Sequence, residues 1–349
     1  MRTGALLALI LALPLPLVAQ NSNPEGTLDF YWVDSEGGGS TLVVTPAGES
    51  ILIDAGNPGR DAERIKRIAT QEAGLTQIDH LIVTHFHGDH FGGAPELAEM
   101  MPILNVWDNG IPERHPDNRP DDTTWARTIQ PYRDMSVQQR HIIQPGGELP
   151  LRGAQNGLTP ELRFVGAQQE FVAPIDGAAP NDRCADAVRK EEDPSDNANS
   201  TVLVLEYGEF RFFHGGDLTW NVEEELVCPV NRVGTVDLYQ VNHHGLGSSN
   251  NPVLVHSLDP IVSVMNNGPR KGTSVEAMAS LRSSPSLLAM YQVHLNVRED
   301  TENNTLLNFI ANVDPDADGN HIHASVAPDG KSYAVSVPAN GHLQTYAVR

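Results

Sequence analysis

The stretch THFHGDHFGG, residues 84–93, decides how this 349-residue chain is interpreted. It follows an apolar strand-like segment and places His85, His87, Asp89 and His90 within six residues. Imidazole and carboxylate groups are good ligands for zinc and similar divalent ions. In an extended turn, alternate side chains project the same way, so the first two histidines can bind one metal ion. Asp89 and His90 lie past a glycine bend and can reach a second ion, so the stretch predicts a metal site.

Outward from this stretch, segments with strand and helix patterns alternate in two similar halves. Strands are predicted at 27–34, 40–44, 50–54, 80–84, 103–107, 140–143, 161–165, 201–206, 209–214, 236–241, 261–265, 289–293, 322–327, 333–337 and 343–348. Helices are predicted at 61–72, at 93–100, from residue 218, at 251–258 and at 275–282. The pattern predicts one α/β domain with layered sheets over residues 27–349, the last three strands forming a meander.

Two segments break this alternation. Residues 109–138 are rich in Pro, Asp and Arg and carry Trp125 and Tyr132. We interpret them as an insertion that lies over or beside the site. Residues 166–199 form a second irregular stretch, also interpreted as an insertion.

The N-terminus has the layout of a secretory signal peptide. Arg2 supplies a positive charge, residues 5–13 are an unbroken apolar run, and Ala19 provides a small residue near a cleavage point. The apolar run is short for a membrane span, although an uncleaved anchor or a first buried helix are alternatives. We therefore expect residues 1–20 to be a signal peptide and the protein to be secreted or periplasmic. No later stretch reaches 18 apolar residues, so we expect no membrane span in the mature chain.

The net charge limits which partners are expected, and the cysteine content bears on the cellular compartment. With 45 acidic and 23 basic residues, the formal net charge is −22. Such a surface repels polyanions at long range and offers no extended nucleic-acid surface. Cys184 and Cys228 are the two cysteines. In an oxidising compartment such a pair can form a disulfide, but the sequence does not say whether the two residues meet.

The stretch at 84–93 resembles the HxHxDH signature of the metallo-β-lactamase superfamily, and further landmarks extend the resemblance over about residues 27–270. Asp54, in ILIDAG, matches an upstream aspartate that orients a metal-binding histidine. Asp217, in FFHGGD, matches the aspartate that bridges both metals, and DLYQVNHHG at 237–245 matches a late histidine motif. The resemblance implies an αββα sandwich, with two mixed sheets, helices on the outer faces and the metals at one edge.

Several landmarks leave alternatives open. Asp54 could be a turn residue, and Asp217 could cap the helix that follows it. One of His243 and His244 is a ligand. Resemblance to the phosphorylcholine esterases of the superfamily favours His244, and it leaves His243 to hold substrate or carry a proton. Asp89 and His243 are the catalytic candidates.

In the middle of the chain, the sequence departs from the best-known ligand pattern of the superfamily. Class B β-lactamases and glyoxalase II-like thioesterases supply a third histidine there, but His115, His141 and His214 do not follow strands in the expected way. The corresponding place holds NANST, residues 197–201, which resembles the hydrolase domain of competence-type DNA-uptake proteins and the phosphorylcholine esterases. Fewer protein ligands at the first metal leave room for a substrate oxygen, which favours phosphoester over β-lactam chemistry.

Three residues are candidates for substrate binding: Asn199 in the NANST block, and Asn267 and Lys271 in the turn after the last metal motif. For the turn, a purely solvated strand-to-helix connection is the alternative.

The resemblance implies a dinuclear hydrolase that uses a metal-bridging hydroxide on a small-molecule or phosphoester substrate. Two divalent ions are expected, with zinc as the default and manganese or iron as alternatives. An acyl hydrolase acting on a lactone, a thioester or a β-lactam is the alternative activity. A non-catalytic secreted metal-binding protein is the second alternative.

Overall fold

The computed structural model describes residues 23, 26–117, 119, 121–153, 157–174, 176–314, 317 and 319–349. The predicted signal peptide, residues 1–20, lies outside the described residues. None of the helices within the described ranges has the length and apolar character needed to cross a bilayer.

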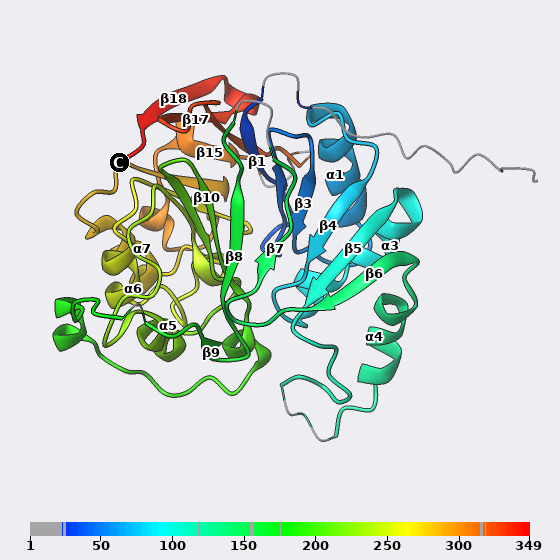
Figure 1. Ribbon diagram of the computed structural model, residues 1–349, viewed down its shortest axis with the longest axis horizontal. Helices are drawn as coiled ribbons and strands as arrows, with labels where there is room; N and C mark the ends of the chain where they lie inside the picture. Colours follow the sequence, from blue (N-terminus) through cyan, green and yellow to red (C-terminus); the bar gives the residue numbers. More distant parts are fainter. Residues whose placement is uncertain are drawn as a thin grey trace, which may run out of the picture.

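Two mixed β-sheets face each other at the centre of the molecule (Figure 1). The first has the strand order β18-β17-β16-β1-β2-β3-β4-β5-β6. Its strands are β1 Leu28–Trp32, β2 Thr41–Val44, β3 Ser50–Ile53, β4 Ile78–Ile82, β5 Ile103–Asp108, β6 Val137–Ile142, β16 Ile322–Val326, β17 Ser332–Val337 and β18 His342–Ala347. The second has the order β15-β14-β13-β12-β11-β10-β8-β7, with β9 paired to β8. Its strands are β7 Glu148–Leu149, β8 Glu161–Ala167, β9 Glu170–Phe171, β10 Val202–Tyr207, β11 Phe210–His214, β12 Leu238–Gln240, β13 Val262–Met265, β14 Ala289–His294 and β15 Ile310–Asn312.

Helices cover the outer faces of both sheets. Helices α1, α3 and α4 lie on the side of the first sheet, and α5, α6 and α7 lie on the side of the second (Figure 1). The α-helices are α1 Asp61–Arg67, α2 Gly88–Phe91, α3 Ala94–Met100, α4 Trp125–Asp134, α5 Trp220–Val227, α6 Pro252–Leu258 and α7 Val275–Arg282. The predicted αββα sandwich is therefore confirmed.

Side chains that alternate between the two faces of the strands form three apolar layers, one between the sheets and one under the helices on each outer side. In β1, Phe30 and Trp32 point into the core between the sheets, while Tyr31 points to the helices on the outer face. Because successive side chains of a strand project to opposite faces, a strand buried on both faces is apolar throughout. This explains why the central strands read as continuous apolar runs.

One expectation about the chain's course needs correction, and another is confirmed. Residues 125–134, a third of the segment 109–138, are not irregular, because Trp125, Ile129 and Tyr132 form a helical stripe that packs α4 on the first sheet. The final three strands do form an antiparallel meander, but β16 pairs with β1 in the first sheet. The end of the chain thus returns to the sheet where it began.

Cys184 and Cys228 form a disulfide across 44 positions of the sequence. The bond joins the segment 166–199 to the end of α5. It restricts the unfolded chain and anchors one part of that segment.

The carboxyl ends of the parallel strands bring the sequence landmarks together. Strands β3, β4 and β5 run parallel in the first sheet, and β11 to β14 run parallel in the second. Asp54 follows β3, the 84–93 stretch follows β4, Asp217 follows β11, and the histidine pair at 243–244 follows β12. Loops at the carboxyl ends of parallel strands are the usual place for binding sites in α/β sheets.

Candidate metal centre

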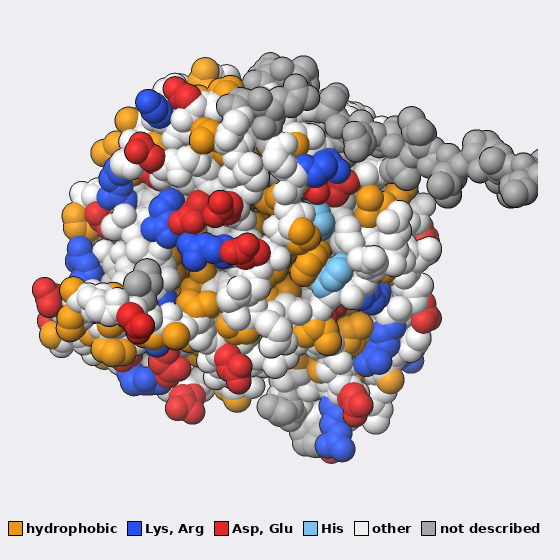
Figure 2. All heavy atoms as spheres, viewed as in Figure 1, with side chains coloured by type: hydrophobic (Ala, Val, Ile, Leu, Met, Phe, Trp, Pro, Cys, Tyr) orange, Lys and Arg blue, Asp and Glu red, His pale blue; other side chains and the backbone are white. Residues whose placement is uncertain are grey.

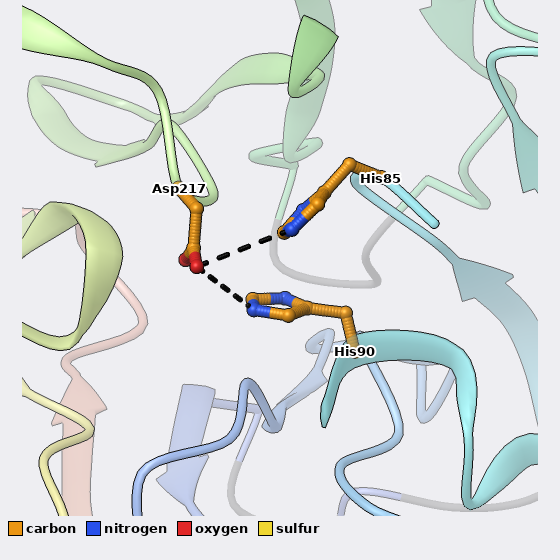
Figure 3. Close-up of side chains that lie close together, drawn as sticks. All are labelled: His85, His90 and Asp217. Carbon is orange, nitrogen blue, oxygen red and sulfur yellow. Dashed lines mark ion pairs between the residues drawn. The ribbon is translucent and has the colours of Figure 1, made fainter. Parts of the chain in front are cut away.

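Two overlapping groups of ligand-type side chains converge where the two sheets meet. One consists of His85, His90 and Asp217, and the other of Asp89, His90 and His244. Within each group the donor atoms lie within 4.8 Å of one another. Figure 3 shows His85 and His90 directed toward the Asp217 carboxylate, whose Oδ2 is 4.0 Å and 3.2 Å from their Nε2 atoms.

His85 and His87 face each other through one ring nitrogen each. The His85 Nε2 and His87 Nδ1 atoms are 3.0 Å apart. The second nitrogen of each ring has an oxygen partner: Asp117 Oδ1 is 2.7 Å from His87 Nε2, and Thr84 Oγ1 is 3.1 Å from His85 Nδ1. Since the outer nitrogens donate to these oxygens, the inner nitrogens carry lone pairs that face each other. A cation between them satisfies both, so these two rings fit a metal ion.

His90 and His244 are oriented in the same way. Asp54 Oδ2 is 2.7 Å from His90 Nδ1, and the Asn266 carbonyl oxygen is 3.1 Å from His244 Nδ1. The Nε2 atoms of the two rings are 3.2 Å apart and lie 3.2 Å and 3.3 Å from Asp217 Oδ2. Histidines that bind metals are held by such partners on their second nitrogen. The residues present therefore fit a second divalent ion, with the Asp217 carboxylate between the two positions.

The backbone around these side chains is constrained. Asp54 adopts φ 60°, and His243 and His244 adopt φ 50° and 55°. Non-glycine residues rarely adopt such angles, and they concentrate at functional sites where the surrounding structure enforces them. Asp54 is held by the Thr84 backbone N–H, which donates to its Oδ1 at 2.8 Å.

A glycine lets β2 approach this cluster. A Cβ on Gly39 would lie 2.7 Å from His90 Nδ1, closer than real side chains come. Any larger residue there would push the His90 ring away from Asp54.

Burial and neighbouring charges shift the pKa values of the site in opposite directions. Burial opposes ionisation of Asp217, but the adjacent His244, His90 and His243 hold its pKa well below the usual range. Burial also disfavours a charged His90, yet Asp217 and Asp54 raise its pKa well above the ordinary value. For His85, burial and the charge of His90 lower the pKa well below normal. The Asp217 carboxylate is thus ionised at neutral pH, as a metal ligand must be.

His243 lies beside the donor groups without joining either. Its Nε2 is 3.4 Å from Asp217 Oδ2, and its Nδ1 is 3.0 Å and 3.1 Å from the hydroxyls of Ser248 and Ser249. Burial lowers the pKa of His243 to about 4, so its imidazole is neutral at pH 7 and able to accept a proton. His244 lies among the candidate ligand atoms and His243 stands next to them, so His244 stays the predicted ligand of the pair.

Lys271 reaches the site as expected, whereas the other two candidate substrate-binding residues do not. The Lys271 ammonium donates to Asp89 Oδ2 at 2.5 Å. Asn267 was wrongly placed, because its buried amide is bonded to the backbone of Gly268 and His294. Asn199 was also wrongly placed, since its amide donates to Asp196 and accepts from Gln169.

Asn197 is the amide of the NANST block that faces the site. Its Nδ2 is 3.4 Å from His243 Nε2, and its buried Oδ1 has no hydrogen-bond partner among the described residues. A buried amide oxygen without a partner is rare and is expected to meet a ligand or water. Within the NANST block, Asn197 contacts His243, whereas the predicted Asn199 bonds Asp196 and Gln169 in the same 3-10 turn at 196–199.

The mid-chain histidines do not supply a further donor to either group among the described residues. His141 stacks on Trp107 at the edge of the first sheet. His214 accepts the Gly216 backbone N–H, and His115 accepts that of Asp117. The expected absence of a third histidine from the first position thus agrees with where these rings lie.

A cavity of about 600 Å³ opens beside His87. Both irregular segments line it, the first through Asp117 and Trp125 and the second through Asp193 and Asn197. Part of the segment 109–138 thus lies beside His87 in the structure. Asp117 was missed, because the sequence offered only its place in an Asp-rich segment as a signal.

Glu223 of α5 holds the turn that carries the histidine pair. Its fully buried carboxylate accepts hydrogen bonds from the Asn242 side-chain amide at 2.7 Å and from the backbone N–H groups of Asn250 and Asn251 at 2.9 Å and 2.7 Å. Burial raises the pKa of Glu223 from 4.5 to about 7 despite these three donors.

This shift predicts a stability that falls with rising pH. Between pH 4.5 and 7 the folded protein retains a proton on Glu223 that the unfolded chain has released, so the free energy of unfolding decreases as pH rises. The Glu223→Gln variant has no titratable group at this position. Denaturant unfolding of both proteins at pH 4.5 to 8 should therefore show wild type losing about 3 kcal/mol more than the variant over this window. Parallel pH profiles would contradict the assignment.

Comparison with known proteins agrees with the site's geometry. Residues 34–151 match a family model described as the metallo-beta-lactamase superfamily. The matched segment contains Asp54 and the 84–93 stretch, and ends before Asp217 and His244.

Two curated relatives and one solved structure illustrate the similarity. A UPF0173 metal-dependent hydrolase from Cupriavidus metallidurans is 32% identical over 92 residues, which cover 26% of this chain and 28% of the relative. Ribonuclease Z from Thermococcus kodakarensis is 38% identical over 65 residues, or 19% of this chain and 18% of the relative. The chain thus spans less than a third of the length of either relative. The metallo-beta-lactamase fold protein YhfI from Bacillus subtilis superimposes with a TM-score of 0.43 at 10% identity, covering 75% of this chain and 95% of that protein.

Proposed function

We propose that this chain, whose residues 34–151 match the model of the metallo-beta-lactamase superfamily, is an extracytoplasmic, dinuclear metal-dependent hydrolase of phosphoester-type substrates. The observation that carries the proposal is the pair of donor groups that share His90 and have the Asp217 carboxylate between them. We expect zinc at both positions, because four imidazoles dominate the donor set.

The proposed chemistry divides between the ions and the chain. Two bound divalent ions would lower the pKa of a water molecule to near neutrality and offset the negative charge that develops on the substrate. His85, His87 and Asp217 would hold the first ion, and Asp89, His90, His244 and Asp217 the second. Asp54 fixes the ring of His90 from behind through the 2.7 Å contact.

Three further side chains act on the substrate in this proposal. The neutral His243 can take a proton at Nε2, which faces Asp217, while its Nδ1 is held by two serine hydroxyls. The Lys271 ammonium, bonded to Asp89, adds positive charge at the second position. The unpartnered Asn197 oxygen and its amide face the first position and can orient a substrate group.

The surroundings of the first metal position favour phosphoester substrates in this proposal. Asn197, rather than a third histidine, stands beside it, so one side is open to a substrate oxygen. A phosphoryl group has several oxygens that can use this space together with the Lys271 charge. A carbonyl substrate needs fewer contacts, so acyl hydrolysis remains the alternative activity.

The charge distribution favours a small substrate over extended nucleic acid. On the face drawn in Figure 2, basic and acidic side chains lie side by side. Among the ion pairs of the described residues, Arg163 and Arg211 both pair with Glu206. With a net charge of −22, such a surface does not attract a long polyanion.

The disulfide supports an extracytoplasmic location. Disulfides form and persist in oxidising compartments, and Cys184 and Cys228 are joined. This agrees with the signal peptide predicted for residues 1–20.

Metal analysis combined with turnover tests the proposal. Protein purified without chelator should contain about two divalent ions per chain and hydrolyse bis(4-nitrophenyl) phosphate. Removal of the ions should reduce turnover by at least about 100-fold, because the ions supply both the nucleophile and charge neutralisation. Added zinc should restore it.

A chromogenic lactam and a lactone should be assayed in parallel. Turnover of either without phosphodiester turnover would replace the phosphoester proposal with acyl hydrolysis. Two bound ions without turnover of any substrate would favour a metal-binding protein. Phosphodiesterase activity that survives chelation would refute the metal-dependent mechanism.

A further inference from the structure

We propose that Asp117 is a positioning residue that fixes His87 for the first metal ion, so that the 109–138 segment helps to set the affinity of that ion. The inference rests on the proposed dinuclear function and assigns a role to a segment outside the shared sequence landmarks. It follows from the contacts of one carboxylate, which is 11% exposed beside a His87 ring that is 22% exposed.

The carboxylate determines which nitrogen of His87 is free. Asp117 Oδ1 lies 2.7 Å from His87 Nε2, and an ionised carboxylate can only accept a hydrogen bond. The proton of His87 therefore resides on Nε2, and the lone pair on Nδ1 is directed at His85 Nε2, 3.0 Å away. Without Asp117, the ring could carry its proton on Nδ1 and block the position between the two histidines.

Two further groups hold Asp117 in place. Its Oδ1 also accepts the Asp196 backbone N–H at 3.0 Å, and its Oδ2 accepts from Arg119 at 2.9 Å. Asp196 in turn accepts the Phe86 backbone N–H at 2.7 Å, between the two histidines of the HxH pair. Both irregular segments and the metal-binding strand end are thus joined through two neighbouring carboxylates.

Orientation of a ligand side chain should have its largest effect on metal affinity at the first metal position. His85 faces His87 there and belongs to one donor group with Asp217, while Asn197 lines the cavity beside His87. With few protein ligands, correct orientation of each one contributes more to affinity. Loss of a partner that orients a metal-binding histidine commonly weakens metal binding by about 10- to 100-fold.

Cobalt titration of the full chain tests this role. Wild-type protein, Asp117→Ala and Asp117→Asn are freed of metal and titrated with Co²⁺ while the ligand-field absorption is recorded. Asp117→Ala should bind one of two equivalents about 10- to 100-fold more weakly, with an altered spectrum for that ion alone. Asp117→Asn keeps an oxygen for both hydrogen bonds but loses the charge, so its affinity should lie between those of the alanine variant and wild type.

Asp121→Asn is the matched control. Asp121 is exposed and lies four positions further along the same segment, so its loss removes the same charge without changing His87. This variant should bind both equivalents as wild type does.

Two results would overturn the inference, and they differ. If wild type binds two equivalents and Asp117→Ala does the same with an unchanged spectrum, Asp117 only holds the segment in place, and the melting temperature of the metal-free variant alone would fall. If wild type itself binds fewer than two equivalents, the dinuclear function fails together with the inference.

Discussion

Asp217→Asn is expected to lower kcat/KM for bis(4-nitrophenyl) phosphate by at least about 1000-fold, or about 4 kcal/mol of transition-state stabilisation. Asp217 Oδ2 lies within 3.4 Å of a ring nitrogen of His90, His243 and His244, so its charge lies among the atoms that would hold the ions. An amide keeps the shape of the side chain but loses the charge that both ions would share. Steady-state kinetics and metal content measured on the same preparation check this expectation.

Asp237→Asn is the control for a buried carboxylate outside the site. Asp237 lies just before β12 and accepts the backbone N–H groups of Arg211 and Arg349 at 2.9 Å and 3.1 Å. Its replacement should cost about 1 to 3 kcal/mol of stability. Metal content and activity per folded molecule should stay unchanged. If Asp217→Asn keeps both metals and full activity, the assigned centre is wrong.

The second large effect is expected when either histidine of the pair after β12 is replaced. His244→Ala should lose one metal ion, because the His244 Nε2 atom lies 3.3 Å from Asp217 Oδ2 and its ring is fixed through Nδ1 by the Asn266 carbonyl. His243→Ala should retain both ions and lose kcat by at least about 100-fold, the usual contribution of a positioned proton carrier. Elemental analysis and kcat for each variant separate the two roles.

His214→Ala serves as the control for removing a buried imidazole near the centre. His214 accepts the Gly216 N–H and stands outside both donor groups. A lower stability with both metals retained is expected. The assignment would be reversed if His243→Ala lost a metal and His244→Ala lost only turnover.

Much of the fold could be predicted because the strands carry strong local signals. The apolar run VLVL at the start of β10 and the apolar residues at the end of β4 indicate buried strands. The HxHxDH stretch then located the site, because ligand spacing is itself a local property. Asp54, Asp217 and His244 followed from motifs at the ends of strands.

The remaining features depend on contacts between distant segments. Nothing local shows that β16 pairs with β1, almost 300 positions away, or that Asp117 reaches His87 across 30 residues. The error between Asn197 and Asn199 has a similar cause, since two asparagines one residue apart are equivalent in sequence. Only the 3-10 turn decides which one faces the site. Helix α4 was missed because Pro131 and the surrounding charges obscured the apolar stripe of Trp125, Ile129 and Tyr132.

The proposed ligands come from both sheets, and this has a thermodynamic consequence. His85, His87, Asp89 and His90 follow a strand of the first sheet, whereas Asp217 and His244 follow strands of the second. Ions bound between these residues would link the two sheets. Only the folded sandwich would bind them, because the ligands come together only there. At free-metal concentrations about 1000 times the dissociation constant, such linkage adds about 4 kcal/mol per ion to the free energy of unfolding. In surroundings that sequester divalent ions, the protein would lose catalysis and resistance to unfolding together.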